Sequence, residues 1–377
     1  MKIGEIANFQ NGYAFKSKDF NNDGKYKIIK IKELKEGKVK FFDDSASVDI
    51  DDEKKFEKYI VRNGDILFAL TGDPVNKNNP LSWVGRVSIY ESNQLALLNQ
   101  RVAKLIPTDK INSKYIYYYF RDFNNFYRLA SIAKGSASQA NISTKDIEAV
   151  EIELPDINIQ DKVVLILDCI EEKININNKI NNNLEEQAMA IFNNIFPNTF
   201  TNDKFIGDFI TPKRGKSLLS KNAVSGDVPV VAGGLKPSTY HNVANTVVPV
   251  ITISASGANA GYVDLWDVPV WSSDSSFIDS SMTENVYFWY AMLRSRQQEI
   301  FDAQTGSAQP HIYPQHIAAM PVYDLNNKDI QYYNSIVTPI FETIGHNDIE
   351  SKILSELRDT LLPKLMSGEI DVSNISI

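Results

Sequence analysis

The stretch of sequence that decides the fold is residues 157–196, INIQDKVVLILDCIEEKININNKINNNLEEQAMAIFNNIF. Apolar residues return along it at alternating steps of four and three, which is the spacing of the contact line in a coiled coil. The sequence therefore predicts one long helix here. Its expected contact line consists of Val163, Leu167, Ile170, Ile174, Asn177, Asn181, Leu184, Ala188, Ile191 and Ile195.

A second stretch repeats this pattern about 170 residues later, with a line of Val337, Ile340, Ile344, Asn347, Ser351, Leu354, Leu361 and Leu365. An asparagine interrupts both lines at the same place, Asn177 in the first and Asn347 in the second. A buried asparagine lowers the stability of a helix pair but fixes its register. We therefore expect two long helices that form an antiparallel coiled coil, and we expect Pro339 to kink or start the second one. The alternative is two amphipathic helices that pack only on their own domains.

The segments outside these helices also repeat. Ile3-Gly4-Glu5-Ile6 returns as Ile206-Gly207-Asp208-Phe209, and Gly135-Ser136-Ala137 returns as Gly306-Ser307-Ala308. Both segments alternate short strand-like runs with clusters of Asn, Gly, Asp and Pro. The expected fold class is α+β, with two pseudo-repeated α/β domains separated by two long helices. The expected bounds are 1–156 for the first domain, 157–197 for the first helix, 198–326 for the second domain and 327–377 for the second helix and tail.

Charge is unevenly spread along the 377 residues, whose formal net charge is −8. Residues 1–40 hold ten lysines and five acids, whereas the helical stretches 157–196 and 327–370 each carry a net charge of −3. The acidic total therefore does not exclude binding to nucleic acid. No apolar run approaches the roughly 20 residues that span a membrane, and the first residues do not resemble a signal peptide. With a single cysteine as well, we expect a cytoplasmic protein without membrane contact.

Patterns typical of catalysis and metal binding are incomplete. No glycine-rich cofactor loop follows a predicted strand. Asp156 with Glu171-Glu172-Lys173 has a spacing found in metal-dependent nucleases, but the second group is expected on a helix face rather than on a strand. His311 and His316 lack nearby cysteines or clustered acids that would complete a zinc site. We therefore expect no catalytic residue, no metal site and no cofactor bound by this chain.

The order of these segments resembles the specificity subunits of type I restriction–modification enzymes. In the first half the resemblance lies in Gly64-Asp65-Ile66-Leu67-Phe68-Ala69 and Leu98-Asn99-Gln100-Arg101-Val102. In the second half and the helices it lies in Trp271-Ser272-Ser273-Asp274, Asn183-Leu184-Glu185, Leu361-Leu362-Pro363-Lys364-Leu365 and Ser367-Gly368-Glu369. The second half departs from the first in having His311-Ile312-Tyr313 in place of Asn141-Ile142-Ser143.

The resemblance implies a division of labour. Each globular domain would be a target-recognition domain that reads one part of a bipartite, asymmetric site on double-stranded DNA. The paired helices would separate the two readers and dock two methyltransferase subunits, which restriction and translocase subunits join. S-adenosylmethionine, ATP and magnesium would belong to those partners. A helix of about 40 residues is roughly 60 Å long, enough to hold two readers about one DNA turn apart.

Two alternatives remain open from the sequence. The first is an adaptor whose coiled coil recruits partners without touching DNA. The second is a restriction enzyme that acts alone, which would need catalytic motifs that the sequence lacks. The adaptor predicts no basic surface on the two domains, whereas the surplus of lysine in residues 1–40 indicates one.

Candidate DNA contacts are basic and small polar residues in loops at equivalent places of the two domains. In the first domain they are Lys16, Lys18, Arg101, Lys134, Ser136, Ser138 and Gln139. In the second they are Arg214, Lys216, Lys221, Ser256, Asn259, Ser307, Gln309 and His311. The aromatic-rich segments 113–130 and 284–301 are expected to be core helices rather than surfaces on which bases stack, because both domains contain one.

Overall fold

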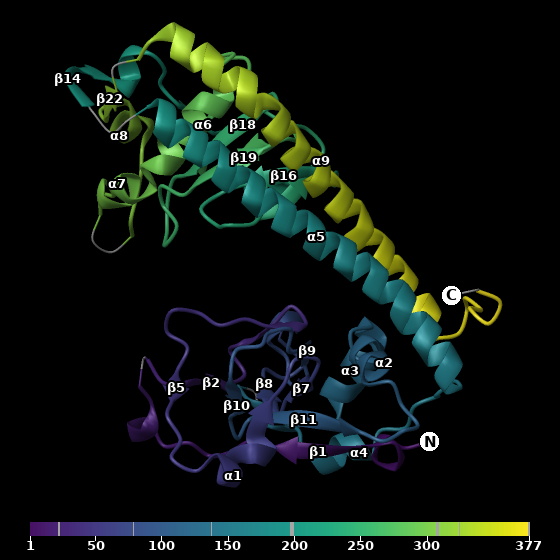
Figure 1. Ribbon diagram of the computed structural model, residues 1–377. Helices are drawn as coiled ribbons and strands as arrows, with labels where there is room; N and C mark the ends of the chain where they lie inside the picture. The colour runs from purple at the N-terminus through teal and green to yellow at the C-terminus, as the bar shows by residue number, and fades with distance from the viewer. Residues whose placement is uncertain are drawn as a thin grey trace. The chain divides into compact units, whose positions relative to one another are not determined.

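The computed structural model describes residues 1–21, 23–77, 79–136, 138–196, 200–306, 309–323 and 325–375. The chain divides into two compact units (Figure 1). Unit 1 contains Met1–Glu172 with Leu354–Ile377, and unit 2 contains Lys173–Ile353. This division passes through both long helices, so the expected domain bounds at 156, 197 and 326 stay a prediction. Within the described ranges, no helix is both long and apolar enough to cross a membrane.

Unit 1 is built on two larger sheets and a small one. The six-stranded sheet has the order β1 (Ala7–Asn11), β11 (Val102–Pro107), β7 (Ile66–Ala69), β9 (Val87–Ile89), β4 (Lys38–Val39), β3 (Leu34–Lys35). The four-stranded sheet has the order β5 (Ser47–Val48), β2 (Tyr26–Ile29), β10 (Ala96–Leu98), β6 (Ile60–Val61). The small sheet joins β12 (Lys134–Gly135), β13 (Ala140–Asn141) and β8 (Thr71–Gly72). Its helices are α1 (Glu53–Phe56), α2 (Ser113–Tyr119), α3 (Phe123–Ser131) and α4 (Thr144–Glu148).

Unit 2 contains corresponding elements. Its four-stranded sheet has the order β15 (Lys213–Arg214), β21 (Ser275–Asp279), β18 (Val250–Ser254), β19 (Val263–Trp266). A three-stranded sheet has the order β17 (Thr239–His241), β16 (Val228–Val231), β20 (Trp271–Ser272), and β14 (Phe200–Phe205) pairs with β22 (Pro321–Tyr323). Its helices are α6 (Val286–Ser295), α7 (Gln297–Asp302) and α8 (Pro314–Ala318).

The two units repeat one topology. The order β1-β11-β7-β9 in unit 1 matches β15-β21-β18-β19 in unit 2, with every neighbouring pair antiparallel. Each unit also contains a corresponding parallel pair, β2 with β10 in unit 1 and β16 with β20 in unit 2. The expected internal repeat and the α+β fold class are therefore confirmed.

The aromatic residues of α2 and most of those of α6 lie in the core, as expected, whereas Phe123 and Tyr127 of α3 are 55% and 46% exposed. Tyr118 of α2 and Tyr290 of α6 are each about nineteen-twentieths buried or more. Burial leaves each hydroxyl in need of a partner, and both find a carboxylate on the first long helix, α5 (Ile157–Ile195). Tyr118 donates a hydrogen bond to Asp168 Oδ1 at 2.7 Å, and Tyr290 donates one to Glu185 Oε1. Burial and the neighbouring carboxylate raise the pKa of both tyrosines. Each globular domain is thereby attached to α5.

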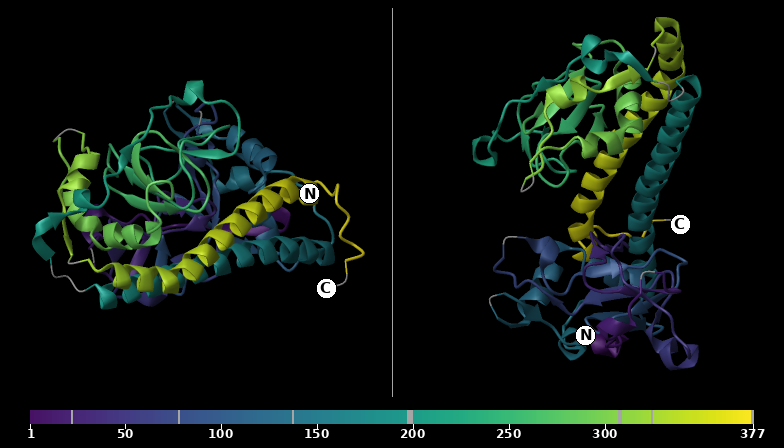
Figure 2. Two further views of the ribbon diagram at one scale, coloured as in Figure 1. Left: turned by 90° about the horizontal axis from the view of Figure 1, so that it is seen from above. Right: turned by 90° about the vertical axis from the view of Figure 1, so that its left-hand side faces the viewer.

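The second long helix, α9 (Asn327–Met366), runs antiparallel to α5 (Figures 1 and 2). In unit 1 Arg358 Nη1 of α9 lies 2.8 Å from Glu171 Oε1 of α5. In unit 2 the rings of Tyr333 and Phe192 lie 5.6 Å apart. Residue numbers thus fall along one helix as they rise along the other, and the expected antiparallel pairing is confirmed. Pro339 does not start the helix, because α9 begins twelve residues earlier, at Asn327, and the alternative expectation of a kink at Pro339 stays a prediction.

Most of the expected contact residues of α5 as far as Ala188 are buried, although Ile174 and Leu184 are only partly buried, and beyond Ala188 the buried line moves by one position. Beyond Ala188 the buried side chains are Phe192 and Phe196, at 0% and 4% exposure, whereas Ile191 and Ile195 are only partly buried. A straight α-helix drifts by about 20° per seven residues against a strict coiled-coil repeat. Here the drift turns α5 toward the aromatic core of unit 2, where Phe192 and Phe196 pack in one cluster with Phe288.

Fewer of the residues expected on the contact line of α9 are buried than on that of α5. Val337 and Leu365 are buried, but the other six expected positions are half-buried. These half-buried residues are Ile340, Ile344, Asn347, Ser351, Leu354 and Leu361. The fully buried neighbours are Phe341 in unit 2 and Leu362 in unit 1, which face the globular cores as well as α5.

The buried amide of Asn177 lies at the contact between α5 and α9, where a charged side chain would lower the stability of the fold. Asn177 is fully buried, and its Nδ2 donates to Glu350 Oε2 at 2.8 Å and to Ser351 Oγ at 3.2 Å. In Asn177→Asp a second, buried carboxylate would face Glu350, whose own charge is already paired with Lys173 at 3.0 Å. We expect the free energy of unfolding at pH 7 to fall by roughly 3–5 kcal/mol, measured by denaturant unfolding.

The cost of the Asn177→Asp substitution depends on pH. Burial would raise the pKa of the new carboxyl above its unfolded value of about 3.9. Its cost is therefore full above the raised pKa and vanishes as the pH falls toward about 4. Asn193→Asp, an exposed position of α5, is the matched control and should change stability by less than about 1 kcal/mol. Equal losses in the two variants would contradict the burial argument.

Candidate nucleic-acid interface

In unit 1 a short hairpin brings together several of the candidate contacts. The turn between β12 and β13 carries Ser136, Ser138 and Gln139, and all three side chains are exposed. The Ser136 N–H donates to the Gln139 carbonyl oxygen at 2.9 Å, and the hydroxyl oxygens of Ser136 and Ser138 lie 3.0 Å apart. A glycine must precede the turn, because a Cβ at Gly135 would come within 2.1 Å of the Gln139 carbonyl oxygen. Lys134, on β12, is exposed beside them.

Arg101 lies next to this hairpin. Its Nη1 donates to Asn141 Oδ1 on β13 at 3.4 Å, and Thr71 Oγ1 on β8 donates to the same oxygen at 2.8 Å. The Arg101 side chain remains exposed, and no acidic side chain pairs with it in the described part of the chain. Five of the seven expected contacts of unit 1 therefore gather at one place, as a cationic donor surrounded by small polar groups.

The other two candidates, Lys16 and Lys18, lie elsewhere in unit 1, at the 3-10 helix η2 (Ser17–Asp19). An aromatic cluster positions this segment. Phe15 stacks on Phe56 of α1 with ring centroids 5.8 Å apart, and Tyr13 contacts Phe56 at 5.1 Å. The two lysines therefore belong with α1 rather than with the hairpin.

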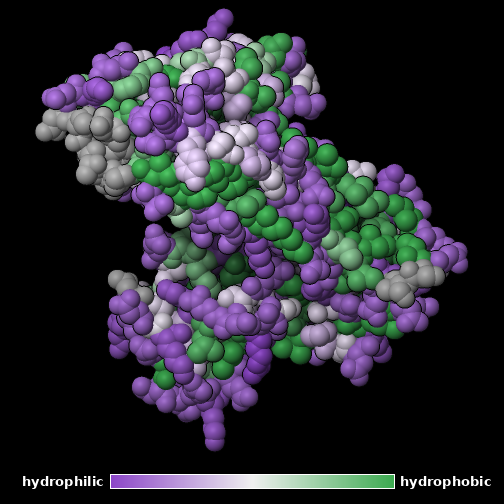
Figure 3. Space-filling model, turned by 45° about the horizontal axis from the view of Figure 1, so that its top comes forward, coloured by the Kyte–Doolittle hydropathy of each residue, from purple (hydrophilic) through white to green (hydrophobic). Residues whose placement is uncertain are grey.

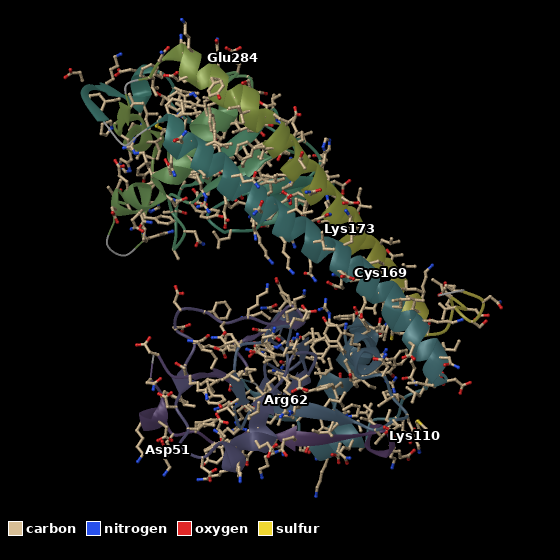
Figure 4. All side chains as sticks on the ribbon, in the orientation of Figure 1. Asp51, Arg62, Lys110, Cys169, Lys173 and Glu284 are labelled. Atoms are coloured by element: carbon tan, nitrogen blue, oxygen red, sulfur yellow. The ribbon has the colours of Figure 1, made fainter. Side chains whose placement is uncertain are left out.

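Next to this cluster lies a basic groove that the sequence reasoning missed. Four exposed cations line it, together with Gln10, Ile106, the buried Lys104 and the single acid Glu57, and its volume is about 570 Å³. The four cations are Lys54, Lys55, Lys58 and Arg62, the last labelled in Figure 4. None of the four side chains has an ion pair within the described part of unit 1.

The sequence hides this groove, because acids stand beside its basic residues. Residues 51–62 alternate acids with lysines, so their net charge hides the basic side chains. The structure engages two of the acids. Asp52 caps α1 by accepting the Lys54 N–H at 3.1 Å, and Glu53 pairs with Lys25 at 2.9 Å. The lysines that remain are free to face a polyanion.

In unit 2 three of the candidate residues meet around an acid. Arg214 Nη2 lies 2.6 Å from Asp274 Oδ1, and the Ser256 hydroxyl donates to Asp274 Oδ2. The backbones of Ser256 and His311 form an antiparallel bridge, so His311 stands beside them. The sequence reasoning missed Asp274, because it selected cations, amides and hydroxyls and not the acid that holds them together.

The remaining candidates of unit 2 are more scattered. Asn259 Nδ2 donates to the Gly233 carbonyl oxygen at 3.4 Å. Lys216 is exposed, and its N–H donates to the Ser272 carbonyl oxygen at 2.9 Å, while Lys221 is exposed at the 3-10 helix η6 (Ser220–Asn222). Gln309 is exposed as well, and Ser307 lies outside the described residues. The role of every candidate in binding DNA stays a prediction.

Comparison with known proteins gives consistent matches. The family model of the type I restriction modification DNA specificity domain matches residues 1–186. The specificity subunit of the type I restriction enzyme MjaIX of Methanocaldococcus jannaschii is 26% identical over 328 residues, which cover 74% of this chain and 73% of that protein. The specificity subunit of the EcoAI enzyme of Escherichia coli is 27% identical over 176 residues, covering 46% of this chain and 28% of that protein.

One solved structure shares the fold. The S subunit of a type I restriction–modification system from M. genitalium covers 97% of this chain and 95% of its own, with a TM-score of 0.61 and 17% identity. That likeness concerns the fold alone. Together with the family match, it confirms the resemblance seen in the sequence.

The basic groove gives a test of phosphate contacts. In the variant Lys55→Gln, Lys58→Gln, Arg62→Gln, DNA binding should weaken for every sequence alike, because phosphates carry no sequence information. The slope of log affinity against log salt should become shallower by about 2 to 3, since each lost phosphate contact removes about 0.9. The measurement is a salt titration of DNA binding by fluorescence anisotropy. A control with Lys2, Lys110 and Lys145 changed to Gln removes the same charge elsewhere in unit 1; an equal effect of both variants would argue against a defined groove.

Proposed function

Residues 1–186 belong to the family of type I restriction modification DNA specificity domains, which makes the chain a type I specificity subunit, and we propose that it reads a bipartite, asymmetric site on double-stranded DNA. A specificity subunit is the non-catalytic subunit of its restriction enzyme. The observation that carries the proposal is the repeated topology of units 1 and 2, with a polar cluster at the same place in each copy. Each copy would read one half of the site.

The asymmetry of the site follows from the side chains of the two clusters. Unit 1 presents Arg101 with Asn141, and unit 2 presents Arg214 with Asp274 and Ser256. Bases are distinguished in the major groove by donors and acceptors at their edges. Two copies of one backbone with different donors and acceptors would therefore read different bases.

The helix pair would act as the spacer between the two readers. The 39 residues of α5 correspond to a rise of roughly 60 Å. Within unit 2, Asn177 donates to the carbonyl oxygen of Asn347, its counterpart 170 residues later, at 3.4 Å. Two antiparallel helices that are copies of one another are related by a pseudo-twofold axis. Equivalent residues of the two helices contact each other only close to that axis. This supports a symmetric spacer around that point.

Exposed aliphatic side chains on the helices would dock the partner subunits. In unit 2 Ile176 and Ile180 of α5 are 43% and 42% exposed, and Ile349 and Ile353 of α9 are 42% and 58% exposed. Figure 3 shows hydrophobic patches between hydrophilic residues on the visible surface. We propose that two methyltransferase subunits cover such side chains, and that restriction and translocase subunits join this core. S-adenosylmethionine, ATP and magnesium would bind to those partners, in the cytoplasm.

The test is methylome sequencing of cells that carry this gene with its methyltransferase partner, compared with cells in which the gene is disrupted. We expect a split, asymmetric methylated motif that disappears with the gene. A pattern of methylation that is indifferent to the gene would overturn the proposal and favour an adaptor that does not touch DNA.

A domain exchange tests the independence of the two readers. Units 1 and 2 have separate hydrophobic cores, one around Phe68 and Phe120 and the other around Phe192 and Phe288. Residues 198–325 should therefore be replaceable by the equivalent segment of another specificity subunit without loss of the first domain. Methylome sequencing should show one half of the motif changed and the other half retained. Changes in both halves would refute independent reading.

A further inference from the structure

Two backbone hydrogen bonds fix the place of Arg101 in unit 1. The Leu70 N–H donates to the Arg101 carbonyl oxygen at 2.9 Å, and the Ile142 N–H donates to the Leu70 carbonyl oxygen at 3.0 Å. Leu70 directly precedes β8, and Ile142 directly follows β13. The Arg101 backbone is therefore tied to the strands that carry the polar hairpin of this unit.

The same two bonds recur in unit 2 around Asp274. The Ala255 N–H donates to the Asp274 carbonyl oxygen at 3.1 Å, and the Ile312 N–H donates to the Ala255 carbonyl oxygen at 3.0 Å. Arg101 and Asp274 therefore occupy the same place in two copies of one fold, although the one is a cation and the other an anion.

The surroundings of the two side chains are matched to their opposite charges. Arg101 contacts the neutral amide of Asn141 and keeps its positive charge unbalanced. Asp274 has Arg214 at 2.6 Å and accepts a further hydrogen bond from Ser256, so its negative charge is balanced. The side chains of Arg214 and Asp274 remain 40% and 39% exposed.

Stability alone is a weak reason for this arrangement in unit 2. An ion pair with this much exposure contributes about 0–1 kcal/mol. A carboxylate on a DNA-reading surface is also repelled by phosphates unless a cation offsets its charge, and Arg214 does so. A carboxylate has about four acceptor positions, and Arg214 and Ser256 take two of them. The others remain available to a donor in solvent or on a ligand.

We propose that Arg101 and Asp274 are equivalent base-reading residues with opposite hydrogen-bond roles. Arg101 donates to the O6 and N7 acceptors of a guanine in one half-site. Asp274 accepts from the exocyclic amino group of a cytosine in the other half-site. Cytosine is favoured over adenine because the adenine amino group stands beside N7, an acceptor that repels a carboxylate. This inference rests on the proposed function and adds to it the chemistry of two positions.

The experiment uses the full chain assembled with its methyltransferase partner. Methylome sequencing first gives the wild-type motif, and the domain exchange described above assigns each half to its unit. Every base pair of both half-sites is then substituted in duplex DNA, and relative affinity is measured by competition for the wild type, Asp274→Asn and Arg101→Gln. Asp227→Asn, at an exposed position of unit 2 outside the cluster, makes the same chemical change as a control.

The wild type should discriminate against substitution of one G·C pair in each half by about 5- to 150-fold. Asp274→Asn should remove that preference, or move it toward adenine, at one pair of the half read by unit 2 and leave the other half unchanged. Arg101→Gln should do the same in the half read by unit 1. Asp227→Asn should keep the wild-type profile.

Several outcomes would overturn the inference while the proposed function stands. One is a wild-type motif without a specified G·C pair in the half read by unit 2, which needs no variant to fold. Another is an Asp274→Asn profile that is unchanged, or that is weakened equally at every base pair, as a merely structural role would give. If no motif depends on the gene at all, the proposed function itself fails.

Discussion

The fold depends on buried amides at the contact between α5 and α9. Asn177 and Asn181 are 0% and 8% exposed, and each has a partner on the opposite helix. Asn181 donates to Asp348 Oδ1 at 2.8 Å, and Asn347 donates to Asn181 Oδ1 at 2.8 Å. A slip of one helix along the other would bury these amides without partners, at a cost of about 1–3 kcal/mol for each lost bond. Apolar residues alone would tolerate such a slip.

The side chains that bond to α5 and α9 keep their partners only in that register. Asp168 and Glu185 of α5 receive the buried tyrosines of the two domains, and Arg358 of α9 pairs with Glu171 where both side chains are only 16% exposed. These bonds are strong only when the partners stay in place, because a buried charge without its partner is costly. A fixed register therefore also fixes how each domain sits on its own part of the helix pair.

Acid groups gather where α5, α9 and β19 meet in unit 2. Glu185, Asp264, Asp267 and Asp348 line a cavity of about 190 Å³ there. Burial raises the pKa of Asp264 and of Asp267 to about 6, and the nearby acids add to both shifts. Because these folded-state values lie above the unfolded ones, the ionised acids lower stability at neutral pH, and that cost diminishes as the pH falls from about 6 toward 4. The asparagine contacts and the aromatic core must offset it.

The sequence predicted the parts of this structure that follow from local pattern. The helix pair, its polar break and the repeat all leave regular spacings, so they could be read directly. The shift from Ile191 to Phe192 could not be read, because it depends on which core α5 faces at its end. Asp274 was missed for a similar reason, since its partner Arg214 lies 60 residues away in the chain. The basic groove was hidden by acids whose caps and ion pairs appear only in the folded chain.

Some equivalent positions of the two copies of the fold accept only one residue type, whereas others accept different residue types. A Cβ at Gly12 would come within 2.1 Å of the Asn99 carbonyl oxygen, and one at Gly215, the equivalent position, within 2.5 Å of the Ser272 carbonyl oxygen. Backbone approaches this close allow only glycine in either copy. The shared hydrogen bonds at Arg101 and Asp274 involve only their backbone atoms, and their side chains have different polar partners, so the same place accepts opposite charges. Under the proposed function, a specificity subunit built this way could change the bases that it reads without disturbing its cores or its helix register.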